Sequence, residues 1–169
     1  MIMWYVIWVA TNKEQQLLTK IENELNGNIY SSVKLPMKVE KRKYKGEWLE
    51  IEKLLFPGYL FVDTDNIKTV ADIIRDYQNC IGVLKIDGQY IPITKKEEAM
   101  LYKLTGDDGR VGVSTGYIEE GRVKVIDGPL QGLEEYIVSV NKHKRVAKIK
   151  LELFGEERTF TAALELVDE

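Results

Sequence analysis

Two strand-like runs of this 169-residue chain are apolar on both alternating faces, and they constrain the fold more than any other feature. The first is 2–9 (IMWYVIWV) and the second is 54–62 (LLFPGYLFV). Such strands need cover on both sides, by helices on one face and by a second domain or a partner protein on the other. An ordinary core and a partner surface both fit this pattern, and periodicity alone does not separate them.

The segments between these runs carry helix signals. Thr11–Glu14 and Thr94–Glu97 each match a capping box, in which two side chains satisfy free backbone N–H groups. Apolar residues recur at helical spacing over 17–25 and 66–77. The order strand, helix, strands, helix, strand predicts an α+β protein that begins with an α/β sandwich, whose helices cover one face of an antiparallel sheet.

The composition of the sequence changes after residue 104. Residues 105–117 hold four glycines and little apolar content, which predicts a flexible linker. Residues 118–169 contain only short strand-like runs, which suit a small five-stranded β-barrel. The expected strands are 122–126, 136–140, 146–154, 159–163 and a last short one near Leu166. We therefore predict domains at 1–104 and 118–169.

The residue counts exclude most catalytic chemistry. The chain has one His and one Cys, so His-based triads, multi-His sites and thiolate metal sites lack their residues. We find no phosphate-binding glycine loop of the P-loop or dinucleotide type. A small α/β enzyme would need a converging polar constellation that the sequence does not offer. We predict no enzymatic activity, no catalytic residues, no cofactor and no metal.

The same counts bear on the compartment. No apolar run approaches the roughly 20 residues of a membrane-spanning helix. The segment 2–10 lacks a basic region and a small-residue cleavage site, and a single Cys suits a reducing compartment. We expect a cytoplasmic protein with no membrane contact.

Charge is distributed unevenly along the chain. With 24 Lys and Arg against 27 Asp and Glu, the chain is not a bulk nucleic-acid binder. Residues 118–169 carry 8 basic and 11 acidic groups, yet 142–150 contains no acid. This local reversal predicts an RNA-binding patch, and the alternative is a solvated hairpin. The candidate RNA-binding residues are Lys142, His143, Lys144, Arg145, Lys148 and Lys150.

Five short segments together resemble a known family. Trp4-Tyr5-Val6 and the segment 55–62 (LFPGYLFV) resemble the N-terminal domain of the NusG family of transcription elongation factors. Residues 120–130 (EGRVKVIDGPL) look like the opening of a KOW domain, and 153–155 with 161–167 look like its closing strands. The resemblance covers nearly the whole chain in the family's order. It implies a ferredoxin-like N-terminal domain and a KOW barrel.

The resemblance also implies a partner, RNA polymerase. Family members grip the clamp helices of its largest subunit with an aromatic surface beside the FPGY strand. Tyr59 and Phe61 are similar to those contact positions, with Phe56 and Trp4 close by, and Thr69 resembles one residue of a second contact in specialised members. The chain is expected to act as a monomer.

A basic segment at 38–45 supports a further interpretation. Its candidate residues are Lys41, Arg42, Lys43 and Lys45. They form either a solvated hairpin tip or a contact with the upstream or non-template DNA strand.

The tail departs from the general members of the family. They usually carry a basic residue after the Phe-Gly pair, where this chain has Glu156-Glu157, and their loop matching 141–145 is far less basic. These departures favour a specialised paralog similar to the LoaP group, an antitermination factor that recognises a hairpin in nascent RNA. The alternatives are a general NusG coupling factor and a ribosome-associated KOW protein, although the pI of about 5.4 disfavours the latter.

Overall fold

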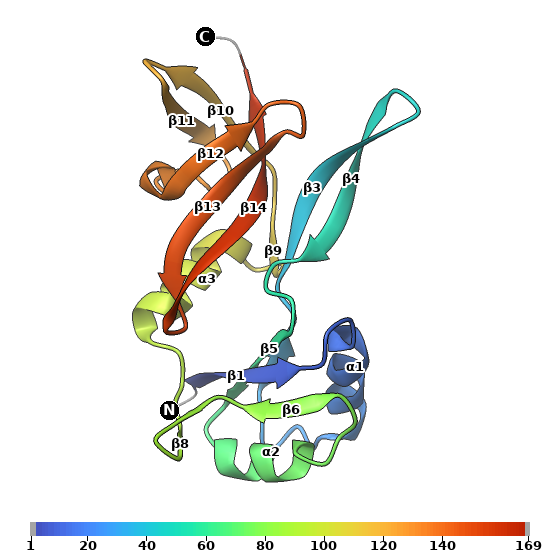
Figure 1. Cartoon of the computed structure of the whole chain (residues 1–169). Helices are drawn as coiled ribbons and strands as arrows, with labels where there is room; N and C mark the ends of the chain where they lie inside the picture. The colour runs from blue at the N-terminus through green and yellow to red at the C-terminus, as the bar shows by residue number, and fades with distance from the viewer. Residues whose placement is uncertain (1–2, 168–169) are drawn as a thin grey trace. The chain divides into compact units, whose positions relative to one another are not determined.

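The computed structural model describes residues 3–167 and consists of two compact units (Figure 1). The first unit is Met1–Pro36 with Phe56–Glu98, and the second is Met37–Leu55 with Ala99–Glu169. The segment 37–55 therefore leaves the first unit and groups with the C-terminal part of the chain. The two units are defined by which residues contact one another, and each consists of two separate segments of the chain. The domain boundaries predicted from the sequence therefore stay a prediction.

The first unit is built on a four-stranded antiparallel sheet in the order β2-β5-β1-β6. Its strands are β1 (Met3–Val9), β2 (Ser32–Lys34), β5 (Tyr59–Thr64) and β6 (Cys80–Val83). Its helices are α1 (Glu14–Glu24) and α2 (Ile67–Ile74). A separate two-stranded hairpin consists of β7 (Lys85–Ile86) and β8 (Gln89–Tyr90). Ile2, expected in the first strand, lies outside the described residues.

The core of the first unit lies between the helices and one face of this sheet. Alternate strand residues point to that face because successive side chains of a strand alternate. The core residues from the strands are Tyr5, Ile7, Val9, Leu60 and Val62, and those from the helices include Leu17, Ile21, Val70 and Ile74. Each such side chain contributes about 1.5–3 kcal/mol when buried. Cys80 packs against this core, and its burial raises the pKa of the thiol.

The second unit contains two sheets. The hairpin of β3 (Met37–Tyr44) and β4 (Glu47–Leu54) is joined by β9 (Arg110–Val111), which runs parallel to β3. The larger sheet has the order β11-β10-β14-β13-β12. Its strands are β10 (Ser114–Glu119), β11 (Arg122–Asp127), β12 (Ile137–Asn141), β13 (Val146–Leu153) and β14 (Glu156–Leu166). The helix α3 (Lys95–Thr105) and a single 3₁₀ turn (Glu134–Tyr136) complete the elements.

Strand β13 shows how the larger sheet separates core from surface. Ala147, Ile149, Leu151 and Leu153 are buried, whereas the residues between them are exposed. Phe160, Ala162 and Leu164 of β14 are buried as well. The exposed positions of β13 include Lys148 and Lys150, so these two candidate RNA-binding side chains share an outward face, as the alternation predicts.

The structure corrects two expectations for the C-terminal half. Residues 105–117, predicted as a linker, contain the end of α3, all of β9 and the first residues of β10. The segments 159–163 and the run near Leu166 are not two strands but one, β14, and the fifth strand of the sheet is β10. Gly116 explains why β10 was missed. A Cβ at that position would lie 2.4 Å from the Lys124 carbonyl oxygen, so the glycine permits close strand pairing and does not mark a flexible segment.

The two predicted capping boxes have opposite outcomes. At α3 the box is confirmed: Thr94 N donates to Glu97 Oε1 at 2.8 Å and Glu97 N donates to Thr94 Oγ1 at 3.1 Å. At α1 the prediction is wrong, because the N-cap is Lys13 and no side chain caps the helix. Glu14 is instead buried, with 2 % of its surface exposed.

Candidate functional sites

The turn that opens β5 is fixed from α1. Glu14 Oε2 accepts a hydrogen bond from Gly58 N at 2.7 Å, and the Gly58 carbonyl accepts one from Val9 N at 2.8 Å. Gly58 has φ +89°, a conformation that glycine adopts without strain. The Phe56-Pro57-Gly58 segment is therefore held on both sides, by a buried carboxylate and by the end of β1.

Aromatic residues alternate along the sheet face opposite the helices. Trp4 and Tyr59 are half-buried, Trp8 is 41 % exposed, and Trp8 lies directly across from Tyr59 in the antiparallel register. This face is thus partly open. Trp8 was not among the predicted site residues, although its alternation with Trp4 and its place in β1 would have indicated it.

Two of the predicted contact residues are not exposed. Phe61 has no exposed surface and Phe56 has 6 %. Their rings lie 6.2 Å apart in an edge-to-face arrangement, a favoured geometry for aromatic pairs. The sequence-based expectation of an open face is therefore met by Trp4, Trp8 and Tyr59 but not by this pair.

Thr69 lies on α2, within the helix layer of the first unit, and is half-buried. Asp63 lies on the same strand face as Tyr59 and Phe61, and its register partner is Trp4. Burial, followed by the charge of Glu98, raises the pKa of the Asp63 carboxyl. Its Oδ1 accepts no hydrogen bond from any residue that the structure describes.

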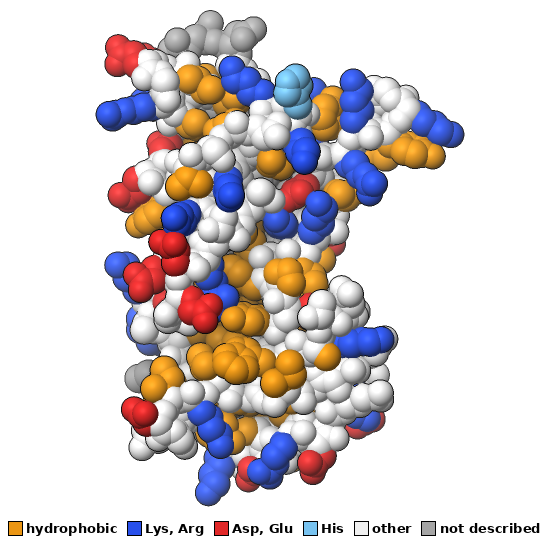
Figure 2. All heavy atoms as spheres, viewed as in Figure 1, with side chains coloured by type: hydrophobic (Ala, Val, Ile, Leu, Met, Phe, Trp, Pro, Cys, Tyr) orange, Lys and Arg blue, Asp and Glu red, His pale blue; other side chains and the backbone are white. Residues whose placement is uncertain are grey.

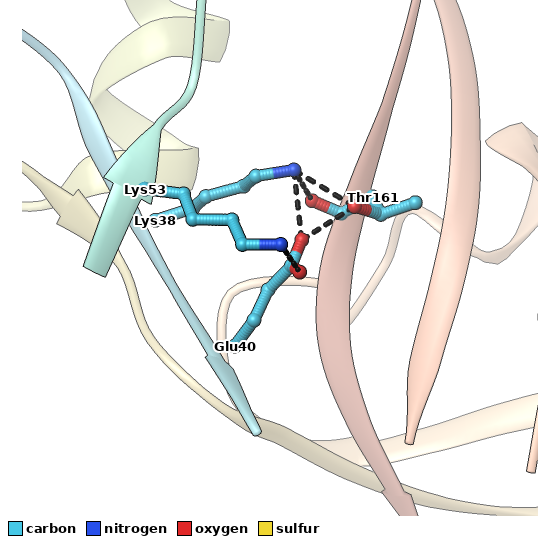
Figure 3. Close-up of polar contacts among 4 residues, drawn as sticks. All are labelled: Lys38, Glu40, Lys53 and Thr161. Atoms are coloured by element: carbon cyan, nitrogen blue, oxygen red, sulfur yellow. Dashed lines mark hydrogen bonds and ion pairs between the residues drawn. The ribbon is translucent and has the colours of Figure 1, made fainter. Parts of the chain in front are cut away.

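In the second unit, a buried charge cluster fixes the β3–β4 hairpin to β14 (Figure 3). Lys38 Nζ contacts Glu40 Oε2 at 2.8 Å and donates to Thr161 through both the carbonyl, at 2.9 Å, and Oγ1, at 2.7 Å. The Thr161 hydroxyl donates in turn to Glu40. Lys53 of β4 reaches the other carboxylate oxygen at 3.1 Å. Lys38 and Glu40 expose only 10 % and 9 % of their side chains.

The cluster decides the ionisation of Glu40. Burial alone would raise the pKa of this carboxyl, but hydrogen bonds from Lys38, Thr161 and Lys53 outweigh it and lower the pKa to about 2. Glu40 is therefore a carboxylate at neutral pH, and Lys38 keeps a partner for its buried charge. The hairpin and β14 are held together by this network.

The hairpin and the loop joining β12 to β13 border a groove of about 640 Å³, which we call the basic groove and which Glu40, Lys53 and Thr161 of the cluster also line. Its basic lining residues are Lys41, Arg42, Lys43, Lys53, His143 and Lys144. Among the lining residues that the structure describes, Glu40 is the one acid, and it is already paired with Lys38 and Lys53. Figure 2 shows the blue Lys and Arg side chains gathered over this hairpin and around the pale-blue histidine. The groove is a region of positive charge.

Arg145 lines a hollow next to the groove and contacts Trp48, a residue of the groove lining. Its guanidinium lies 4.1 Å from the ring centroid of Trp48 and 3.5 Å from Glu165 Oε1. The Arg145 backbone has φ +56°, and its carbonyl accepts from Leu164 N at 2.9 Å. The backbone at Arg145 is thus fixed to β14, whereas its side chain rests on an aromatic ring from the hairpin.

The structure therefore joins two sets of predicted residues that the sequence kept apart. Lys41, Arg42 and Lys43, expected to meet DNA, line the same groove as His143 and Lys144, expected to meet RNA. Three further candidates, Lys45, Lys148 and Lys150, lie outside its lining, and Lys142 lines an adjacent hollow with Arg145. Sequence reasoning missed Trp48. The two-residue turn Lys45-Gly46, which places Trp48 opposite Lys43, was the available signal.

The described residues contain neither a membrane-spanning helix nor a cluster of metal ligands. No helix within residues 3–167 is long and apolar enough to cross a membrane. Across the same residues, no three His, Cys, Asp or Glu side chains gather in a group that could hold a metal ion.

Comparison with known proteins identifies the family. The family model described as "Transcription termination factor nusG" matches residues 3–101. The transcription termination/antitermination protein NusG of Borreliella burgdorferi is 26 % identical over 167 residues, covering 90 % of each chain. That of Streptococcus pyogenes is 27 % identical over 160 residues, covering 91 % of this chain and 88 % of its own.

A solved structure shows the same fold. It is titled "Domain interaction in Thermotoga maritima NusG", is 18 % identical, and matches with a TM-score of 0.61 over 96 % of this chain and 94 % of its own. Because the family model spans more than half of the chain, the protein belongs to the NusG family of transcription termination and antitermination factors.

Proposed function

We propose that the protein is a specialised NusG-type elongation and antitermination factor, which binds RNA polymerase through its first unit and structured nascent RNA through its second unit. The observation that carries the RNA part is the basic groove with the adjoining loop 142–145, a dense positive surface on a chain of net charge −3. Phosphate contacts supply most of the affinity of such surfaces. A KOW-type domain that recognises an RNA hairpin, as in LoaP-type paralogs, fits this arrangement.

For the polymerase contact we propose the open aromatic face of the first unit. Trp4 and Tyr59 are half-buried there and still present ring surface, and large aromatic side chains commonly dominate protein interfaces. Phe56 and Phe61 support this surface from within, and Thr69 on α2 makes the second contact. The clamp helices of the largest polymerase subunit are the partner that the family resemblance implies.

The hairpin tip with Lys45 extends beyond the basic groove and is suited to the non-template DNA strand. The protein acts stoichiometrically, as a monomer in the cytoplasm, and needs no cofactor or metal. A general NusG coupling factor would show no preference among RNAs. A ribosome-associated protein would bind ribosomal RNA and would not co-purify with polymerase.

The polymerase contact is tested by co-purification with RNA polymerase, comparing the wild type with a Trp4→Ala, Tyr59→Ala double variant. We expect the double variant to lose at least about 2 kcal/mol of binding while keeping its thermal stability. Phe61→Ala serves as the contrast, because removing a buried Phe costs about 3–5 kcal/mol of folding stability. Wild-type affinity in a folded double variant would contradict the proposal.

The RNA contact is tested by titrating a labelled RNA stem–loop against the full chain and against a Lys142→Ala, Lys144→Ala, Arg145→Ala variant. We expect the triple variant to lose most of its affinity. The matched control neutralises three exposed lysines of the first unit, Lys13, Lys68 and Lys96, and should bind as the wild type does, although its net charge changes equally. Equal losses in both variants would show that only bulk charge matters.

A further inference from the structure

We infer that Trp48 is a stacking platform for an unpaired RNA base, and that Arg145 occupies this platform until RNA binds. The inference rests on the proposed function, because it assigns a role within the same RNA surface. It goes further in naming a residue, a class of ligand feature, and an exchange of partners at one ring.

The Trp48 ring is placed at the groove by the β3–β4 hairpin. Trp48 lies in β4 directly opposite Lys43 of β3, so both side chains project on one side of the hairpin. Trp48 lines the basic groove and is half-buried. A large aromatic ring at the wall of a positively charged groove is the arrangement that proteins use to bind single-stranded nucleic acid, in which the groove follows the phosphates and the ring stacks a base.

The Trp48 ring is covered by the Arg145 side chain. The Arg145 guanidinium lies 4.1 Å from the ring centroid, within the range of a cation–π contact. A planar guanidinium on an aromatic face occupies the position that a planar base would take. The ring can therefore bind a flat partner, and in this structure the protein provides that partner itself.

Glu165 holds Arg145 in place. Glu165 Oε1 lies 3.5 Å from Arg145 and 3.3 Å from Lys41 Nζ, so one carboxylate restrains both Arg145 and Lys41, a residue of the groove lining. Arg145 and Glu165 expose 39 % and 35 % of their side chains, so their attraction is weakened by water. A phosphate replaces such a carboxylate readily, because Arg binds both in the same two-pronged geometry.

These contacts define an exchange. When RNA enters, Arg145 turns from Glu165 to a phosphate, its backbone remaining anchored to β14, and an unpaired base stacks on the uncovered Trp48 ring. Stacking of one base is worth roughly 5- to 150-fold in affinity. Arg145 gives up a solvent-weakened ion pair with Glu165 and forms an ion pair with the phosphate in its place. The stacked base adds a contact that a fully paired duplex does not make, so the exchange favours RNA with unpaired bases.

The test compares two RNA probes on the full chain: a stem–loop, and a blunt duplex with the sequence of its stem. Trp48→Ala should lower affinity for the stem–loop by about tenfold or more and leave affinity for the duplex nearly unchanged. Trp48→Phe, which keeps an aromatic face, should lose less. Tyr44→Ala is the matched control, because Tyr44 is a 59 % exposed aromatic residue of the same hairpin that does not line the groove.

Two further measurements are independent of overall affinity. The chain has three tryptophans, so the stem–loop should quench a component of the fluorescence that is absent from Trp48→Phe. Glu165→Gln should raise stem–loop affinity a few-fold, because it releases Arg145 and leaves Lys41 with Glu50 as its one carboxylate partner among the described residues.

The outcomes separate the two proposals. Wild-type stem–loop affinity in Trp48→Ala, together with loss in the Lys142, Lys144 and Arg145 triple variant, would overturn the platform and leave RNA binding standing. Equal losses on stem–loop and duplex would also overturn it, since Trp48 would then only support the hairpin. If the full chain bound a DNA strand of the same sequence more tightly than the RNA stem–loop, the Trp48 platform would be assigned to DNA. Absence of RNA binding by the wild type would remove the proposed function itself.

Discussion

The two units position the side chains of their candidate sites by different means. In the first unit, the aromatic residues alternate along strands of one sheet, and the strand geometry sets their spacing. In the second unit, the basic residues come from a hairpin and a loop nearly a hundred positions apart in sequence, and a buried charge cluster brings them together. A surface made within one sheet can be recognised in a sequence pattern, whereas one made by joining two segments depends on contacts that no local pattern reveals.

The largest expected effect concerns that cluster. Glu40→Ala would leave the buried Lys38 ammonium without its carboxylate, which typically costs about 3–5 kcal/mol. We expect a lower unfolding midpoint in urea and faster hydrogen exchange in β3 and β4. Glu47→Ala, at an exposed position of the same hairpin, should change neither. If exchange in the hairpin were unchanged in a folded Glu40→Ala protein, the hairpin would not depend on β14.

Acid should weaken the same cluster through Glu40. Its folded pKa of about 2 lies below its ordinary value of 4.5, so the stabilisation is complete above about pH 4.5 and is lost as the pH falls toward 2. The shift corresponds to about 3 kcal/mol. Urea unfolding of the wild type and of Glu40→Gln over this range isolates the contribution. The gap in stability between them should narrow with acid, and a constant gap would contradict the assigned pKa.

A corresponding but smaller effect is expected in the first unit. Glu14→Ala would leave the partly buried Gly58 N–H without its acceptor, at a cost of about 1–3 kcal/mol. Glu14→Gln keeps an acceptor oxygen and should cost less. The control is Glu24→Ala on the same helix, whose exposed ion pair with Lys20 contributes little. Thermal unfolding measures each change, and a stable Glu14→Ala protein would show that the Phe56–Gly58 turn needs no support from α1.

Much of the first unit could be predicted from the sequence because its determinants are local. Runs that are apolar on both faces identified β1 and β5, and helical spacing of apolar residues identified α1 and α2. Glu14 shows the limit of such reasoning. Its spacing from Thr11 satisfies the capping pattern, yet its carboxylate binds Gly58, 44 positions away. Both arrangements satisfy a backbone N–H group, and only the fold decides which one is made.

The second unit was less predictable for the same physical reason. Glycines in 105–117 indicated flexibility, but Gly116 serves close pairing of β10 with β11. The basic residues were found on both segments, while their meeting in one groove was not, because Lys38, Glu40 and Thr161 give no local sign of a shared contact. Trp48 was overlooked because its role depends on Arg145, which approaches it only in the folded unit.

The smallest predicted effect tests whether charge on the second unit acts residue by residue. Lys148 and Lys150 share the exposed face of β13, but Lys150 Nζ lies 3.4 Å from Glu157 Oε1. A lysine that contacts one phosphate contributes about 0.7–0.9 to the slope of log affinity against log salt. A lysine already beside a carboxylate contributes less, because its charge is partly compensated before RNA arrives. Lys148→Ala should therefore flatten the slope more than Lys150→Ala, and Glu157→Gln should steepen it.

Titrations of the RNA stem–loop at several salt concentrations measure these slopes. Polymerase affinity, which we assign to the apolar face of the first unit, should change little over the same salt range. Equal slopes for the two lysine variants would mean that the RNA responds to the overall field of the second unit and makes no individual contacts along β13.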